Sequence, residues 1–187
     1  MCLSLVGSEM CIRDRSEPKR ATILDSMNLW INIAYDELIQ AMKRVDIVVI
    51  NDGEVTMLAD SQNLVEAAKK VQLMASIPTL IIKKGEHGVL ALHGDDMIAL
   101  PAYPTDVVVD PTGCGDTFAG SLAACLSNGV GQIGTDELRQ ALIHATVSAS
   151  FTLENFGTRG IESMDLDSYQ ERLDTYCSIS GTSVDTS

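Results

Sequence analysis

Short β-branched apolar runs alternate with stretches of helical periodicity along this chain, and this alternation limits its fold more than any other feature. The runs 47–50 and 80–82 have the length of strands, and between them residues 63–75 place apolar side chains on one helical face. Polar or glycine-rich turns follow the runs, as at Asn51-Asp52-Gly53. Strands that alternate with helices in this way predict an α/β fold with a doubly wound, mostly parallel sheet and helices on both faces.

The periodicity also places individual elements. We expect strands at residues 21–24, 46–50 and 79–82, a hairpin in which 89–92 and 97–100 flank a turn at 93–96, and helices at 35–44, 63–75, 117–126 and 135–151. Val107-Val108-Val109 is a further strand-sized run, and Thr135 is a candidate N-cap. Residues 178–187 are polar, and we expect them to form a disordered tail.

The composition describes an acidic globular protein. Of 187 residues, 45% are hydrophobic and 21% charged, and 13 Lys and Arg against 26 Asp and Glu give a net charge of −13. Such a chain repels phosphate backbones and anionic membranes, so we expect neither nucleic acid nor a membrane as a partner. An anionic ligand must then be bound by local backbone N–H groups, a helix N-terminus or a metal ion.

Two further features concern the compartment and the N-terminus. The five cysteines are irregularly spaced and lack metal-ligand spacing, so we expect free thiols in a reducing cytoplasm. Residues 1–16 show neither strand nor helix periodicity and resemble a translated sequencing adapter, with a short native extension as the alternative. We therefore expect a non-native extension at 1–16 and a folded portion at 17–177.

A glycine-flanked acid follows the last apolar run, in Gly113-Cys114-Gly115-Asp116. The two glycines let a ligand approach the backbone, and the N–H groups of a helix that begins there form an anion hole. An acid beside an anion hole suits deprotonation of a hydroxyl that attacks a phosphoryl group. The alternative is that Asp116 is only a first-turn helix residue favoured by the helix dipole.

Two other turns carry candidate ligand-binding residues. Asn51 and Glu54 are three apart at a strand-to-helix junction, where their oxygens suit Mg²⁺ through water molecules, or alternatively form an Asx turn with a capping box. In Lys83-Lys84-Gly85-Glu86-His87-Gly88 the glycines have room for nucleotide phosphates or ribose, or else form a plain turn.

Together and in this order, the three turns resemble the ribokinase-like (PfkB) family of carbohydrate and nucleoside kinases. Asp110 to Gly120, DPTGCGDTFAG, is similar to the C-terminal signature of that family nearly residue for residue. Asn51-Asp52-Gly53-Glu54 resembles its N-x-x-E magnesium motif, and Lys84 to Gly88 its G-x-x-G nucleotide turn. The resemblance extends from Arg20 to about Tyr176.

The resemblance implies transfer of the γ-phosphoryl group of ATP to an alcohol of a sugar or nucleoside. It implies that Asp116 is the catalytic base, that the amides of Gly113, Cys114 and Gly115 stabilise the transferring group, and that Asn51 and Glu54 hold the Mg²⁺ hydration shell. The residues implied to bind the nucleotide are Lys84, Gly85, Gly88, Thr112, Thr146 and Gly157. In some members a monovalent cation such as K⁺ is bound, here by Asp110 and Thr112.

The sequence departs from the family at two points. Cys114 replaces the usual alanine, and the helix-end potential should lower the pKa of its thiol. Family members also carry an N-terminal half, with a β lid and most sugar contacts, which this chain lacks before Arg20. We therefore expect the chain by itself to be inactive.

Two alternatives to the C-terminal portion of a catalytic kinase stay open. The first is a non-catalytic nucleotide-binding fragment of such a kinase. The second, a dinucleotide-binding oxidoreductase, is disfavoured because no G-x-G-x-x-G follows an early strand. The resemblance is compatible with a homodimer of the full-length protein.

Overall fold

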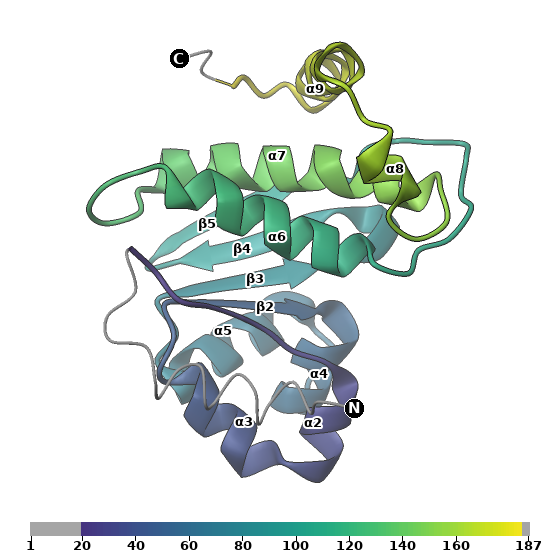
Figure 1. The fold of residues 1–187 in the computed structure, drawn as a ribbon. Helices are drawn as coiled ribbons and strands as arrows, with labels where there is room; N and C mark the ends of the chain where they lie inside the picture. The colour runs from purple at the N-terminus through teal and green to yellow at the C-terminus, as the bar shows by residue number, and fades with distance from the viewer. Residues whose placement is uncertain (1–19, 185–187) are drawn as a thin grey trace. The chain divides into compact units, whose positions relative to one another are not determined.

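The computed structural model describes residues 20–184, which form two compact units (Figure 1). The described part of the first unit holds residues 20–84 and 90–98, and that of the second holds 85–89 and 99–184. The predicted extension at 1–16 lies outside the described residues. Within residues 20–184, no helix combines the length and apolar character that a membrane span needs.

A five-stranded mixed sheet forms the centre of the first unit. Its strands follow one another in the order β1 (Ile23–Asp25), β2 (Ile47–Asn51), β3 (Thr79–Lys83), β4 (Val89–His93) and β5 (Asp96–Leu100). β1, β2 and β3 are parallel, with Ile47 opposite both Ile23 and Thr79. Thr79 Oγ1 lies 2.7 Å from His93 Nδ1, which pairs the start of β3 with the end of β4 and makes these strands antiparallel. The tight turn at Gly94 then returns β5 to the direction of β1–β3, so the mostly parallel sheet is confirmed.

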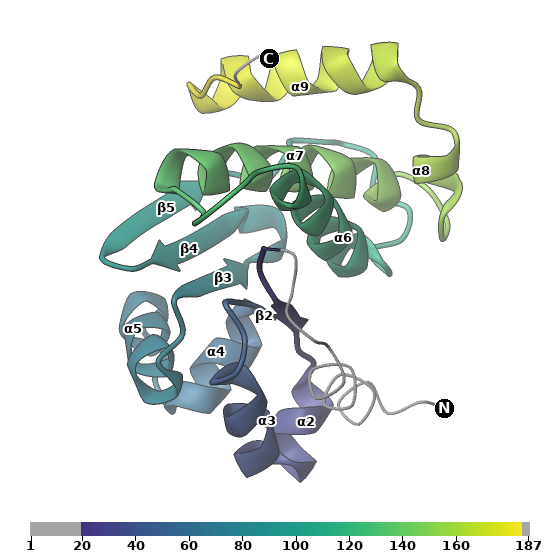
Figure 2. The ribbon, with the colours of Figure 1, turned by 60° about the vertical axis from the view of Figure 1, so that its left-hand side comes forward.

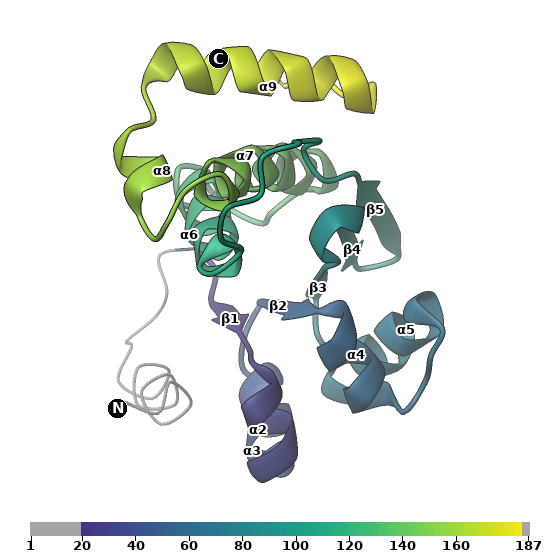
Figure 3. The ribbon, with the colours of Figure 1, turned by 90° about the vertical axis from the view of Figure 1, so that its right-hand side faces the viewer.

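Four helices lie on the same side of β1–β3 (Figures 1 and 3). They are α2 (Asn28–Ile33), α3 (Tyr35–Met42), α4 (Asp52–Ala59) and α5 (Leu64–Ala75). Val48 and Ile50 of β2 belong to the apolar core that includes these helices. Ile47 and Val49 point to the other face because side chains alternate along a strand, and they too are fully buried. Both faces of the strand are thus covered, as its unbroken apolar sequence predicts.

The second unit is built around one long helix, α7 (Thr135–Leu153). It contacts the three other helices of this unit, α6 (Cys114–Ser127), α8 (Arg159–Glu162) and α9 (Leu166–Ser180). α6 and α7 lie side by side (Figure 2), with hydroxyl pairs Thr117–Thr152 at 2.8 Å and Ser121–Ser148 at 3.0 Å between them. α9 is seen end-on in Figure 1 and lengthwise in Figure 3, whereas α7 shows the opposite, so the two helices cross.

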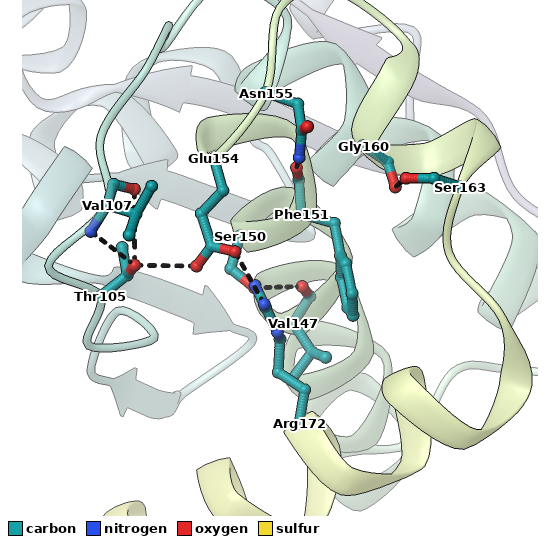
Figure 4. A network of polar contacts seen from close by, with 10 residues as sticks. All are labelled: Thr105, Val107, Val147, Ser150, Phe151, Glu154, Asn155, Gly160, Ser163 and Arg172. Atoms are coloured by element: carbon teal, nitrogen blue, oxygen red, sulfur yellow. Dashed lines mark hydrogen bonds and ion pairs between the residues drawn. The ribbon is translucent and has the colours of Figure 1, made fainter.

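Arg172 of α9 anchors this helix to the C-terminal end of α7 (Figure 4). Its guanidinium donates to Glu154 Oε2 at 2.8 Å and to Ser150 Oγ at 3.0 Å. The same group stacks on the Phe151 ring, 3.9 Å from the centroid. Thr105 Oγ1 donates to the other Glu154 oxygen at 2.8 Å and so ties the preceding loop into the network. Ion pairing and ring stacking together suit the planar guanidinium of arginine.

Several details differ from the sequence expectation. Residues 107–109 form no strand; Val108 is 65% exposed, and the N–H groups of Val109 and Asp110 both donate to Leu153 O instead of to a neighbouring strand. α9 continues to Ser180, three residues into the predicted tail, and ends at Gly181 with a φ of 66°. The N-cap of α7 is Gly134, not Thr135.

Candidate active site

Asn51 and Glu54 cap the N-terminus of α4 reciprocally. The backbone N–H of Glu54 donates to Asn51 Oδ1 at 2.8 Å, and the backbone N–H of Asn51 donates to Glu54 Oε2 at 2.9 Å. This is the capping box that the sequence offered as the alternative to a magnesium site. The cap fixes the two side chains at the carboxyl end of β2, the edge at which ligands bind to parallel sheets.

Glu54 is a buried carboxyl group in a charged neighbourhood. Only 2% of the residue is exposed, and this burial raises the pKa of its side chain above the ordinary value. The N–H of Asn51 and the positive charge of Lys83 act in the opposite direction, while Asp25 adds to the increase. Within residues 20–184, no three acidic, histidine or cysteine side chains are grouped as a metal site. Coordination of Mg²⁺ through water therefore remains a prediction for this pair.

Asp25 and Lys83 are the functional candidates that the sequence reasoning missed. They are the last residues of β1 and β3, the two strands that flank β2; Lys83 is opposite Asn51 and Asp25 is opposite Val49. Lys83 Nζ donates to both carboxylate oxygens of Asp25, at 3.0 and 3.1 Å. The available signal was that each residue is the first charged one after an apolar strand in a predicted parallel sheet.

The glycine turn after β3 is closed by its own backbone. Gly85 to His87 form the short 3₁₀ helix η1, and the N–H of Gly88 donates to Gly85 O at 3.1 Å. A Cβ on Gly88 would lie 2.1 Å from Leu100 O, so Gly88 lets two stretches of backbone pack together and leaves no room for a ligand there. A Cβ added to Gly85, in contrast, would have no heavy atom within 4 Å. Lys84 is partly exposed.

The glycine-flanked acid lies at the N-terminus of α6, as predicted. Gly113 is the N-cap with a left-handed φ of 87°, which favours glycine. The N–H of Cys114 donates to Pro111 O at 3.2 Å and is therefore already used. The N–H groups of Gly113 and Gly115 have no partner among the described residues. The exposed Asp116 side chain, in the first turn, also has no hydrogen bond or ion pair within residues 20–184.

The loop before α6 is organised by Asp110. Its Oδ1 accepts from the N–H of Thr112 at 2.9 Å, and this bond lowers the pKa of the Asp110 carboxyl. The pKa of the Cys114 thiol is raised, first by burial and then by the charge of Asp110. The expectation of a lowered thiol pKa was therefore wrong, because both effects disfavour the thiolate at this helix end.

The two remaining predicted nucleotide residues lie in different surroundings. Thr146 is buried within α7, and its hydroxyl proton is already donated to Leu142 O at 2.8 Å. Gly157 lies in an exposed turn after α7 with a φ of 61°. Of the predicted nucleotide residues, Gly85, Gly157 and the partly exposed Lys84 stay compatible with ligand contact, together with the exposed Thr112.

The mixed sheet with its packed helices is an α/β fold, and the glycine-capped N-terminus of α6 carries an acid in its first turn. The chain matches the pfkB family of carbohydrate kinases over residues 17–164. It therefore belongs to that family, as its motifs indicate.

Relatives and solved structures agree with this assignment. The chain is 36% identical over 96 residues to a cytidine kinase of Thermococcus kodakarensis, covering 50% of this chain and 34% of the relative. It is 33% identical over 109 residues to the bifunctional protein HldE of Pseudomonas aeruginosa, covering 58% of this chain and 22% of the relative.

The fold is that of ribokinase-family structures. Aminoimidazole riboside kinase from Salmonella enterica, solved with aminoimidazole riboside and an ATP analog, matches with a TM-score of 0.70 at 23% identity, over 91% of this chain and 56% of that one. Ribokinase from Thermotoga maritima matches with a TM-score of 0.67 at 20% identity, over 88% and 52%. The chain thus spans about half of these structures and a third or less of the two curated relatives.

Proposed function

We propose that this chain carries the phosphotransfer site of an ATP-dependent sugar or nucleoside kinase. The observation that carries the proposal is the N-terminus of α6, where the unpaired carboxylate of Asp116 follows the unpaired N–H groups of Gly113 and Gly115. Membership of a family of carbohydrate kinases supports the same reaction class.

The backbone N–H groups and the carboxylate at the N-terminus of α6 have complementary roles. The N–H groups of Gly113 and Gly115, with the positive end of α6, stabilise negative charge on the transferring phosphoryl group. The N–H of Cys114 is occupied by Pro111 O, so we assign it no such role. Asp116 accepts the proton of the attacking alcohol as general base.

ATP and Mg²⁺ are the proposed cofactors. Asn51 and Glu54 offer hard oxygen atoms, as Mg²⁺ prefers. Because Asn51 Oδ1 and Glu54 Oε2 already accept hydrogen bonds in the cap, we assign both side chains to the water shell of the ion. When bound, the ion neutralises charge on the nucleotide phosphates. Asp110 and Thr112 are the residues we assign to a monovalent cation such as K⁺, and Lys84, Gly85 and Gly157 to the nucleotide.

The acceptor is proposed as a sugar or nucleoside, as the names of the relatives suggest for those proteins. The net charge of −13 supports a small-molecule substrate over nucleic acid or a membrane surface. Free thiols at Cys114, Cys125 and Cys177 support a cytoplasmic location. A homodimer is proposed for the full-length protein only.

A second candidate is a nucleotide-binding fragment without turnover. The observation in its favour is that the chain spans 34% of the cytidine kinase and 56% of the aminoimidazole riboside kinase. Both candidates predict ATP binding, and only the first predicts transfer.

One experiment on a single sample separates them. ATP binding is measured by calorimetry, and phosphate transfer from γ-labelled ATP is measured across a panel of sugars and nucleosides. Binding with transfer supports the kinase, and binding without transfer to any acceptor supports the fragment. The absence of ATP binding contradicts both.

A further inference from the structure

The loop of residues 101–113, which leads into α6, is not held by structure of its own. It contains no helix or strand, and none of its residues is buried. Its apolar run 107–109 is between 40% and 65% exposed, so hydrophobic packing does not hold it either. Apart from the bonds that begin α6, the hydrogen bonds that join this loop to other elements, within the described residues, go to the end of α7 and to α9. These two helices therefore position the loop.

The end of α7 holds the loop through one backbone and one side-chain acceptor. Leu153 O accepts from the two loop N–H groups described above. Glu154 Oε1 accepts from the hydroxyl of Thr105 at 2.8 Å (Figure 4). The Thr105 oxygen in turn accepts from the N–H of Val107 at 3.1 Å. The Glu154 carboxylate thus reaches the middle of the loop through a single threonine side chain.

Arg172 of α9 fixes the carboxylate that holds Thr105. Its guanidinium donates to Glu154 Oε2 at 2.8 Å, so the two oxygens of this carboxylate connect α9 with the loop. The guanidinium lies 3.9 Å from the centroid of the Phe151 ring and 4.9 Å from that of Tyr103, which belongs to the loop. Only 17% of the Arg172 side chain and 19% of the Glu154 side chain are exposed. Because the guanidinium is planar and is held by both hydrogen bonds and rings, it gives the carboxylate a defined orientation.

The loop ends at the proposed phosphotransfer site. Asp110, whose N–H is bonded to the end of α7, accepts from the N–H of Thr112 at 2.9 Å, and Gly113 then caps α6. A displacement of the loop therefore displaces the N–H groups assigned to the transferring phosphoryl group. A misplacement of about 1 Å in such a site costs on the order of 100-fold in rate.

We propose that Arg172 is a positioning residue of the phosphotransfer site: by holding Glu154, it fixes the loop 101–113 and with it the N-terminus of α6. It acts through Glu154 and Thr105 and takes no part in the chemistry. Arg172 lies beyond residues 17–164, the segment that matches the family, so the family match assigns it no role. The inference rests on the proposed kinase function and adds to it a role for α9.

The test compares Arg172→Met and Thr105→Val in the full-length protein, because this chain by itself is expected to be inactive. Thr105→Val removes the link between the loop and Glu154 and leaves the ion pair of Arg172 in place, so it tests the inference even if Arg172→Met unfolds. Thr105→Ser keeps the hydroxyl and is the conservative control. Gln170 is exposed on α9 and donates to Asp174 Oδ1 at 2.8 Å, so Gln170→Met removes a polar contact of α9 outside this network.

Turnover and the KM for ATP are measured below the temperature at which any of the variants begins to unfold. We expect Arg172→Met and Thr105→Val to lower turnover roughly 10- to 100-fold at a nearly unchanged KM for ATP. Thr105→Ser should regain most of the turnover, and Gln170→Met should equal the unaltered protein. The N–H groups of Val109 and Asp110 should exchange their hydrogens faster in Arg172→Met and Thr105→Val, because the loop is held less firmly.

Two results overturn the inference while leaving the proposed function intact. One is unchanged turnover in Arg172→Met or in Thr105→Val. The other is a loss of turnover that Thr105→Ser does not restore or that Gln170→Met shares, which would make these contacts merely structural. If the unaltered full-length protein transfers no phosphate from ATP, the proposed function fails, and the inference fails with it.

Discussion

Asn51 and Glu54 exchange two hydrogen bonds, each accepting from the backbone N–H of the other at 2.8 and 2.9 Å. The exchange begins α4 directly at the end of β2, with no intervening loop. It also holds two oxygen-bearing side chains in fixed positions at the edge of the sheet. A motif that family resemblance links to magnesium is therefore also a helix cap, and the two roles make separable predictions.

Asn51→Ala should lower the free energy of unfolding by about 1 kcal/mol through loss of the cap, and should also raise the Mg²⁺ concentration needed for half-maximal ATP binding. Asn63→Ala is the matched control, because Asn63 caps α5 by accepting from the N–H of Glu66 at 3.0 Å. Urea unfolding and Mg²⁺ titrations of ATP binding are compared. Identical Mg²⁺ titrations for the two variants would leave Asn51 with the capping role alone.

Gly88→Ala should destabilise the protein more than Gly85→Ala. Both glycines have positive φ values, 84° and 55°, so each alanine bears a similar backbone penalty of about 1–2 kcal/mol. At Gly88 alone, the new Cβ would lie 2.1 Å from Leu100 O and 2.5 Å from the Pro101 carbonyl carbon. This overlap should add roughly 1–3 kcal/mol or more. Equal urea midpoints for the two variants would contradict the close packing of this turn.

His144 should make the second unit less stable at acidic pH. Its Nδ1 lies 2.6 Å from the hydroxyl of Tyr169, and burial lowers the pKa of the imidazole below its ordinary 6.5. The pKa of Tyr169 is raised to about 12, so that hydroxyl stays protonated. The unfolded chain therefore takes up a proton near pH 6.5 that the folded chain resists, and stability is lost as the pH falls below this value.

The measurement is urea unfolding between pH 7.5 and pH 5 for the unaltered chain and His144→Gln. The unaltered chain should lose stability more steeply, by at most about 1.4 kcal/mol per pH unit for one proton. Glu54, whose raised pKa favours the folded state at low pH, acts in the opposite direction in both proteins and cancels in the comparison. Parallel pH profiles would show that His144 is not the group responsible.

Several of the regular elements were predictable because their signals are local. The run Ile47–Ile50 is apolar at every position, and it forms a central strand buried on both faces. The periodicity of residues 63–75 predicted helix α5, which begins one residue later, at Leu64, with Asn63 as its N-cap. The predicted position of Gly113-Cys114-Gly115-Asp116, at the start of a helix, is likewise confirmed.

Features that depend on distant residues were not predictable. The pairing of Asp25 with Lys83 joins residues 58 apart in sequence and depends on the order of the strands. The burial of Thr146, which the family resemblance assigns to the nucleotide, was not predictable because sequence position alone does not reveal which side of α7 is covered. Residues 107–109 have strand propensity, but they form no strand. The backbone N–H groups of Val109 and Asp110 donate to Leu153 O instead. Tertiary partners decide these cases.

Asp116→Asn tests the central claim most directly, with Asp136→Asn as its control because Asp136 is a first-turn acid of α7. Both substitutions are made in the full-length protein, because the chain by itself is expected to be inactive, and phosphate transfer from ATP and ATP affinity are measured on the same samples. We expect Asp116→Asn to lower turnover by about 10²–10⁴-fold at unchanged ATP affinity, and Asp136→Asn to leave both unchanged. Turnover by Asp116→Asn equal to that of Asp136→Asn would contradict the role of Asp116 as base and reduce it to a residue favoured by the helix dipole.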